Sequence, residues 1–225
     1  MKLRTIFSYI LKSIIAVASI TGVVLFAIPG VDGFMGGGKS FMYFTIQSNM
    51  AIAVVAIIGI ILMVIKKQSH AWEAIQLVFT ISISLTGCVF CFVLAPTMGA
   101  VAFGIKNILT HMIAPICSIA DFFVENKKYK LLKRDVAYVI IPPICYVIYA
   151  GIGYALNWQW SDGVNYPYFF LNWGSPAGAF GFSKEAPYMG TVYYILILAG
   201  FVVGLSFLYV YLSNLANKKN FDKSC

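Results

Sequence analysis

Hydrophobic residues along this chain form six long runs, separated by short connections that are polar or rich in glycine and aromatic residues. Each run is close to the ~20 apolar residues with which a helix crosses the hydrocarbon core of a bilayer. The pattern therefore predicts an all-α polytopic membrane protein, a single six-helix domain over residues 1–225. The predicted spans cover residues 6–28, 41–65, 73–95, 101–124, 135–156 and 191–213.

The composition supports this prediction. The chain is 60% hydrophobic, has a mean hydropathy of +0.85 and contains only 11% charged residues. A soluble protein of this size could not bury so much apolar surface. The net charge of +8 would suggest a nucleic-acid partner in a soluble protein, but here the positive residues stand in short connections. We therefore expect no nucleic-acid partner.

The Lys and Arg residues predict the orientation. With the amino terminus inside, thirteen of the sixteen fall on inside segments, Lys39 and Lys184 fall outside, and Lys106 lies within the fourth span. Because cytoplasmic loops are enriched in Lys and Arg, we predict that both termini are cytoplasmic. The first apolar run continues well past residues 16–18, which resemble a signal-peptidase site, so we predict an uncleaved anchor.

Four uncharged polar residues stand close together in the first third of the second run: Thr45, Gln47, Ser48 and Asn49. Polar groups within a span lose water and must find partners, so this clustering needs a reason. At about 100° per residue, Thr45, Ser48 and Asn49 share one helix face, while Gln47 points elsewhere. We predict that this face meets a second polar face.

The fourth run supplies that second face, together with the only histidine within a predicted span, His111. A helix facing lipid would not carry such a polar stripe, so we expect it to face protein or a wet cavity. Pro115 lacks an N–H group and so frees the carbonyl of His111 from its helical bond. The stripe consists of Asn107, Thr110, His111, Ala114, Ser118 and Asp121.

A hydroxyl beside a neutral imidazole is the minimal activated nucleophile, because the imidazole accepts the hydroxyl proton as the oxygen attacks a carbonyl. Counted from the predicted span starts, Thr45 lies ~6 Å and His111 ~15 Å below the outer boundary. These depths do not predict contact, and Ser48 matches His111 in depth equally well. Asp121 lies a further ~15 Å along the helix, too deep to complete a triad.

An oxyanion formed in such a reaction needs hydrogen-bond donors. Backbone N–H groups within a helical span are already bonded, so we expect side-chain amides to serve. Gln47, Asn49 and Asn107 lie near the right depth. The alternative is that these amides only join neighbouring spans, at under ~2 kcal/mol for each bond.

The five cysteines do not indicate redox or metal chemistry. Cys88 and Cys91 form a C-x-x-C, but this spacing is one helical turn within a span, where packing of small residues is the simpler explanation. The chain has two histidines, and only one lies within a span, which excludes a bis-histidine haem within one subunit. We expect no metal and no cofactor.

The longest predicted outside loop, residues 157–189, carries ten aromatic residues. Aromatic side chains favour the membrane–water interface, so one interpretation is an interfacial belt. The other is a cap folded over an apolar substrate entrance.

Three segments resemble matching segments of the androgen-induced family of multi-pass membrane proteins: FTIQSN (44–49), HMIAPICSIADFF (111–123) and YPYFFLNW (166–173). This family includes the androgen-dependent regulator of tissue factor pathway inhibitor and bacterial six-span relatives. Its animal enzymes are intramembrane threonine hydrolases that cleave fatty acid esters of hydroxy fatty acids. The resemblance implies that Thr45 is the nucleophile and His111 the base. Phe122 stands where bacterial relatives commonly have Trp.

We therefore expect a hydrolase of lipid esters in a bacterial cytoplasmic membrane, with a substrate from the bilayer and no obligatory protein partner. The alternatives are a small-molecule transporter or channel and a non-catalytic lipid-binding protein. A rhomboid-type protease is set aside because no G-x-S-G precedes a late histidine. The expected site comprises Thr45 and His111, with Gln47, Ser48, Asn49, Asn107 and Thr110 around the substrate.

Overall fold

The computed structural model describes residues 3–28 and 37–221, and in these ranges helices form nearly all of the regular structure. Six helical stretches are long and apolar enough to cross a membrane, which confirms the all-α polytopic fold. They are α1 (Leu3–Ala27), α2 (Phe44–Val64), the third span (α3, His70–Val89; η2, Phe90–Leu94; α4, Ala95–Met98; η3, Gly99–Phe103), the fourth span (α5, Ile105–Ile108; η4, Leu109–Ile113; α6, Ala114–Val124), the fifth span (η5, Lys133–Ile140; α7, Ile141–Ala155) and α8 (Thr191–Phe221).

The third span is longer than the sequence predicts. The predicted end of this span at residue 95 is wrong, because Ala95–Met98 continues the helix (α4). Proline is tolerated at the start of a helical turn, where its missing N–H costs little. The chain reverses instead at Gly99, whose φ of +57° suits glycine, and the fourth helix begins after Gly104.

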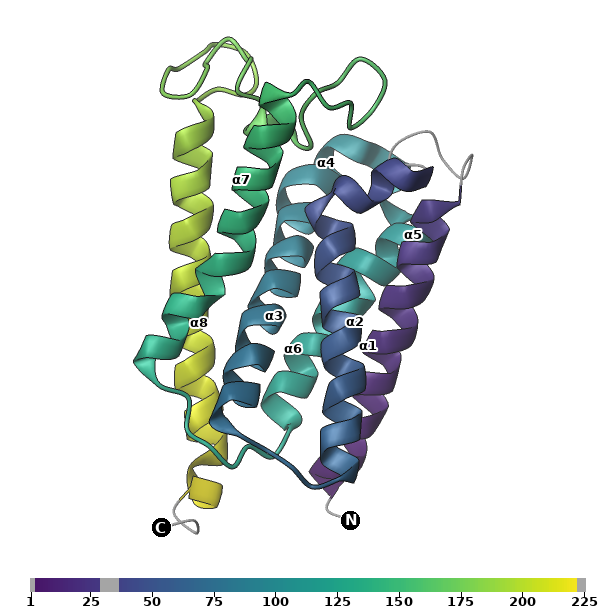
Figure 1. Ribbon diagram of the computed structural model, residues 1–225, viewed down its shortest axis with the longest axis vertical. Coiled ribbons are helices and arrows are strands. Elements are labelled where there is room, and N and C mark those ends of the chain that lie inside the picture. The colour runs from purple at the N-terminus through teal and green to yellow at the C-terminus, as the bar shows by residue number, and fades with distance from the viewer. Residues whose placement is uncertain (1–2, 29–36, 222–225) are drawn as a thin grey trace.

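The helices form one bundle in which α1, α2, α3 and the fourth span pack against one another, while α7 and α8 lie beside α3 (Figure 1). α1 begins and α8 ends at the same end of this bundle. The loop between α7 and α8 covers the opposite end. We call this the loop end.

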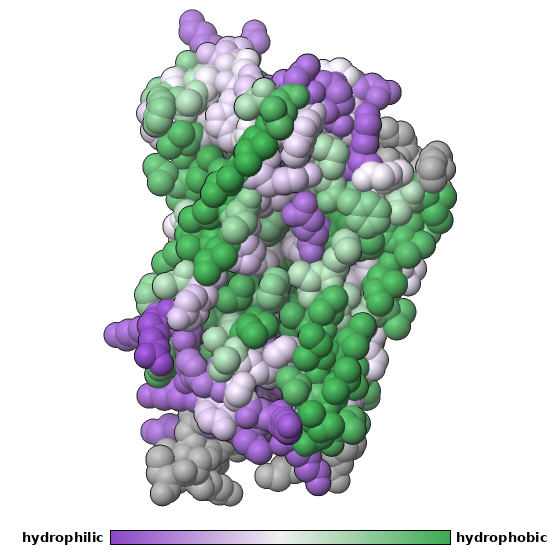
Figure 2. Space-filling view, in the orientation of Figure 1, coloured by the Kyte–Doolittle hydropathy of each residue, from purple (hydrophilic) through white to green (hydrophobic). Residues whose placement is uncertain are grey.

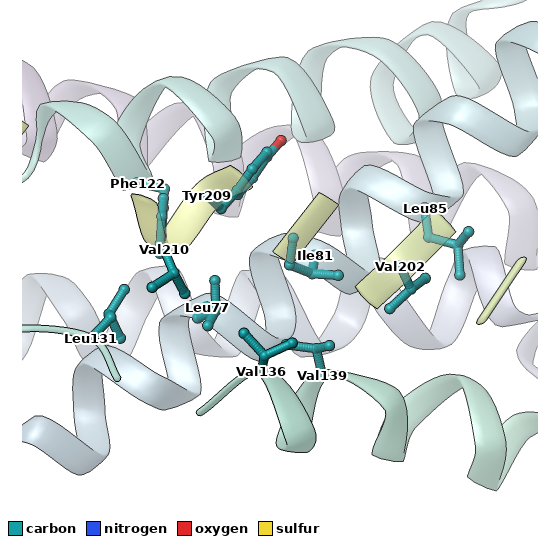
Figure 3. Close-up of a cluster of buried hydrophobic side chains, with 10 residues drawn as sticks. All are labelled: Leu77, Ile81, Leu85, Phe122, Leu131, Val136, Val139, Val202, Tyr209 and Val210. Atoms are coloured by element: carbon teal, nitrogen blue, oxygen red, sulfur yellow. The ribbon is translucent and has the colours of Figure 1, made fainter. Parts of the chain in front are cut away.

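On the face shown in Figure 2, hydrophobic side chains make up most of the middle, apart from one hydrophilic patch, and hydrophilic side chains gather towards the two ends. Such a band suits the hydrocarbon core of a bilayer. Because lipid is as apolar as leucine, the helices are held together mainly by van der Waals packing and hydrogen bonds. Figure 3 shows a packed cluster that joins α8 to α3 and to the fourth and fifth spans; it consists of Leu77, Ile81, Leu85, Phe122, Leu131, Val136, Val139, Val202, Tyr209 and Val210.

A buried ionic network lies towards the end of the bundle where α1 begins. Lys12 is one of the thirteen residues that the sequence assigns to the inside, but it lies within α1 and is 1% exposed. Its ammonium forms ion pairs with Asp121 and, at 3.1 Å, with Glu125. Ser8 Oγ donates to Asp121 at 2.6 Å, and Gln76 Nε2 donates to Glu125 at 2.5 Å. The network therefore ties α1 and α3 to the end of α6.

Replacing Lys12 by methionine is expected to lower the free energy of unfolding by about 3–5 kcal/mol, because two buried carboxylates lose their cation. The measurement is denaturant unfolding in micelles. Lys39→Met is the matched control, since the pair between Lys39 Nζ and Asp162 Oδ1 is 3.4 Å long and solvent-exposed. Equal stability of the two variants would show that the network contributes no more than a surface pair.

Candidate functional site

Thr45 lies in the first turn of α2 and is buried. The chain enters this helix from η1 (Gly37–Met42), which crosses above the start of α2 (Figure 1). Tyr43 precedes the helix in an extended conformation, and its carbonyl accepts the N–H groups of Ile46 and Gln47. The hydroxyl of Thr45 thus stands at the helix start, towards the loop end.

The structure brings Thr45 and His111 together. Thr45 Oγ1 lies 3.3 Å from His111 Nε2, and both side chains are buried. The offset in depth estimated from the sequence is removed by the inclination of the fourth helix. Both helices begin later than predicted, α2 at Phe44 rather than residue 41 and the fourth helix at Ile105 rather than residue 101, so these two shifts nearly cancel. The fourth helix is inclined to α2 (Figure 1), so each of its residues adds less depth.

The other ring nitrogen of His111 fixes the tautomer. Thr110 Oγ1, at 2.9 Å from Nδ1, already donates its own hydrogen to the Lys106 carbonyl. The carbonyl of Asn107, at 3.2 Å, can only accept. Because both of these neighbours of Nδ1 act as acceptors, Nδ1 carries the proton. Nε2 then presents a lone pair to the Thr45 hydroxyl. This is the arrangement of a base oriented by a third group.

Single turns of π-helix place the groups around the imidazole. In η2 the Ala95 N–H bonds the Phe90 carbonyl, and in η4 the Ala114 N–H bonds the Leu109 carbonyl. Such turns rotate neighbouring side chains relative to an α-helix and occur often at functional sites. Here Phe90 stacks on His111, with ring centroids 3.8 Å apart and an angle of 22° between planes. The ring shields one face of the base.

The carbonyl of His111, which the sequence predicts Pro115 to free, faces Gly87 on α3. A side-chain carbon at Gly87 would come within 3.1 Å of that oxygen and 3.0 Å of the Pro115 ring. Glycine at this position therefore lets α3 and the fourth span approach closely beside the base.

The other predicted site residues lie around Thr45 and His111, but not all of their side chains point to these two residues. Ser48 Oγ lies 2.7 Å from Thr86 Oγ1 and 3.0 Å from the carbonyl of Thr45, so its hydroxyl is turned to α3 and its own helix. Thr110 supports His111 through Nδ1. The prediction that Thr45, Ser48 and Asn49 share one face of the helix is confirmed, because all three are buried, whereas Gln47 is more exposed.

The predicted amide donors bond backbone carbonyls. Asn49 Nδ2 donates to the carbonyls of Thr45 at 2.8 Å and Thr110 at 3.1 Å, which uses both of its hydrogens. Asn107 Nδ2 donates to Val101, and Gln47 Nε2 donates to Phe41. In this arrangement the three amides join or terminate helices.

Tyr168 is a site residue that the sequence pattern does not single out. It comes from the aromatic loop, and its phenol lies within hydrogen-bonding reach of the Thr45 hydroxyl, of the N–H groups of Phe44 and Thr45, and of the Tyr146 hydroxyl. Burial raises the pKa of the Tyr168 phenol, and these hydrogen bonds offset the rise only in part. The phenol is therefore protonated at neutral pH.

Two cavities meet at Thr45. One, of about 80 Å³, lies between α2, α3, α7 and α8; we call it the apolar cavity, and its walls include Leu85, Val147 and Val202. The other, of about 530 Å³, lies beneath the aromatic loop; we call it the loop-side cavity. Residues that line both cavities are Thr45, Phe90, Leu94 and Tyr168.

The loop-side cavity is the more polar of the two. His111, Asn107 and Lys106 line it from the fourth span, and Ser161 and Tyr166 from the loop. Thr45 thus lies between a hydrocarbon-lined space and one that also carries polar groups, which suits a molecule with an apolar chain and a polar group.

Asp121 lies away from this pair, as the sequence predicts, and belongs to the Lys12 network. Among residues 3–28 and 37–221, no cluster of three His, Cys, Asp or Glu side chains could hold a metal ion. Comparisons of the chain with family models, with curated proteins and with solved structures find no match.

Proposed function

We propose that this membrane protein is a threonine hydrolase of lipid esters. The observation that carries the proposal is the contact between Thr45 Oγ1 and the lone-pair nitrogen of His111, 3.3 Å long, at the junction of the apolar cavity and the loop-side cavity. The resemblance of segments 44–49 and 111–123 to threonine hydrolases points to the same pair.

The first half of the reaction transfers the acyl group to Thr45. As the Thr45 oxygen forms a bond to the ester carbonyl carbon, its proton passes to His111 Nε2, and the carbonyl π electrons move to the oxygen. The oxyanion then re-forms the carbonyl, the bond to the alcohol oxygen breaks, and His111 returns the proton to the leaving alcohol. The products are an acyl-threonine and a free alcohol.

Water completes the cycle. The water oxygen attacks the acyl-threonine carbonyl while His111 takes a proton from the water. The bond between the acyl group and the Thr45 oxygen then breaks, and His111 returns the proton to that oxygen. The Asn107 carbonyl and Thr110 hold the imidazole in the required tautomer throughout. The acid and alcohol released account for all atoms of ester and water.

The cavities indicate how an ester is oriented. The apolar cavity offers almost only hydrocarbon, so the acyl chain next to the carbonyl lies there. The alcohol portion lies in the loop-side cavity, whose polar groups accommodate it and whose volume admits water.

Filling the apolar cavity is expected to change the acyl preference. In the Ala199→Phe variant, a ring would project from α8 into the apolar cavity and compete with the acyl chain. We expect kcat/KM for a long-chain ester to fall at least about tenfold relative to an acetate ester. Leu196→Phe, at a 62% exposed position on the same helix, is the control. An unchanged preference would show that the acyl chain binds elsewhere.

The test of the proposed function is turnover of fluorogenic long-chain esters by the purified protein in micelles, paired with flux measurements in liposomes. Release of fatty acid and alcohol in equal amounts supports the hydrolase. Solute flux without ester cleavage would support a transporter instead, and co-purified lipid that is bound but never cleaved would support a lipid-binding protein.

A further inference from the structure

The oxyanion of the proposed reaction needs a donor close to Thr45, and the three amides expected to serve are engaged with backbone carbonyls. The expectation that every backbone N–H group within a span is already bonded is wrong for the first turn of α2, because the first N–H groups of a helix lack intrahelical acceptors. Phe44 and Thr45 occupy these positions.

One oxygen already lies among these donors. The Tyr168 phenol is in reach of the N–H groups of Phe44 and Thr45 and of the hydroxyls of Thr45 and Tyr146. A hydroxyl has two lone pairs and one hydrogen. The N–H groups of Phe44 and Thr45 can occupy both lone pairs of the Tyr168 oxygen. Tyr146 donates its own hydrogen to the Met42 carbonyl at 3.3 Å, so the Tyr168 hydrogen is left for the oxygens of Thr45 and Tyr146. Donation to a phenol oxygen also polarises its O–H and strengthens it as a donor.

Packing holds the Tyr168 ring in place. It stacks on Phe170, with ring centroids 5.2 Å apart and planes at 3°, and meets the edge of Tyr43 at 5.9 Å. Phe170 is buried, and so is Trp160, which anchors the same loop against α7 at Gly153. A donor fixed before the reaction needs no reorganisation when charge develops, which is the condition for strong stabilisation of an oxyanion.

We infer that Tyr168 is a catalytic residue of this site: its phenol O–H donates a hydrogen bond to the ester carbonyl oxygen and holds the oxyanion formed when Thr45 attacks. The inference rests on the proposed function. When substrate binds, its carbonyl enters between Thr45 and Tyr168, and the phenol hydrogen moves from the threonine oxygen to the carbonyl oxygen. No proton leaves Tyr168, so the atoms and charges of the reaction are unchanged.

This assignment gives the aromatic loop a role in the reaction itself. The part of the loop around Trp160 and Phe170 packs on the bundle and presents Tyr168 to the helix start. The later part, including Phe180, Phe182 and Tyr188, is exposed. A cap therefore describes the first part of the loop, and an interfacial belt suits the second.

The test compares Tyr168→Phe with the wild type in ester hydrolysis. Loss of one oxyanion donor is expected to lower kcat about 10²–10³-fold with little change in KM. Tyr188→Phe removes a hydroxyl from the exposed part of the same loop and is the control, with kcat expected at the wild-type level. A Tyr168→Phe kcat within about threefold of the wild type overturns the inference.

Binding measurements separate catalysis from folding. A trifluoromethyl ketone with a lipid chain forms a tetrahedral oxyanion with the nucleophile, whereas an ether analogue of the ester does not. The Tyr168→Phe substitution is expected to weaken binding of the ketone by the same factor by which it lowers kcat/KM. It is expected to leave the Kd of the ether analogue unchanged. Partial unfolding raises the apparent Kd of both ligands by the same factor, so only a selective loss for the ketone reports the missing donor. Equal weakening of both ligands, or of neither, contradicts the inference.

The outcomes also separate this inference from the proposed function. If the wild type cleaves no ester and is not modified by the ketone, the proposed function fails, and the role of Tyr168 fails with it. If the wild type cleaves esters and depends on Thr45 while Tyr168→Phe remains fully active, the hydrolase stands, and only the assignment of Tyr168 is overturned.

Discussion

Replacing Thr45 by valine is expected to lower kcat for ester hydrolysis by at least about 10³-fold, because the variant has no oxygen to attack the carbonyl. Valine has nearly the shape of threonine, so the buried packing at the start of α2 should be kept. The measurement is steady-state hydrolysis of a fluorogenic lipid ester by the two purified proteins, with thermal unfolding followed in parallel.

Ser48→Ala is the comparison for this prediction. Ser48 lies one helical turn deeper, and its hydroxyl is engaged with Thr86 and with the carbonyl of Thr45. It is therefore expected to keep kcat within about tenfold of the wild type. If Thr45→Val stays active and Ser48→Ala is inactive, the nucleophile is Ser48, and the assignment of Thr45 is wrong.

Replacing His111 by glutamine is the second large expected loss, again at least about 10³-fold in kcat, because no base remains to take the threonine proton. Groups that act as one unit are strongly non-additive. The double variant Thr45→Val, His111→Gln should therefore be no slower than the slower single variant. The measurement is the same ester assay on all three variants.

His70 provides the matched control for His111. It is the other histidine of the chain, lies at the start of α3 and has Nε2 3.0 Å from Asp135 Oδ2. His70→Gln is expected to keep wild-type kcat. If the His111→Gln variant is active, or if the kcat loss of the double variant equals the product of the two single losses, the two residues do not work together.

Most of the fold follows from hydropathy, because a span must be a long apolar helix whatever it packs against. Two predictions failed where tertiary structure decides the outcome. Lys12 lies inside α1 rather than on an inside segment because Asp121 and Glu125, more than a hundred residues away, supply its partners. The span containing Pro96 continues because proline begins a further helical turn there.

The candidate pair was predictable from polar residues within apolar runs, but its contact was not. The inclination of the fourth helix, which places His111 at the depth of Thr45, depends on packing among several helices. Tyr168 could not be singled out, because aromatic residues in an outside loop look the same whether they lie in the interface or enter the bundle. Segment 166–173, which contains both Tyr166 and Tyr168, was the one available signal, through the resemblance.

The most direct test of the central claim is to identify the residue that becomes covalently modified. The purified protein is treated with a fluorophosphonate carrying a lipid chain, digested and sequenced by tandem mass spectrometry. The proposed hydrolase mechanism predicts one phosphonyl group on the peptide containing Thr45, located on the Thr45 oxygen, and much slower modification of His111→Gln. Modification of another residue, or none under conditions in which esters are cleaved, would contradict it.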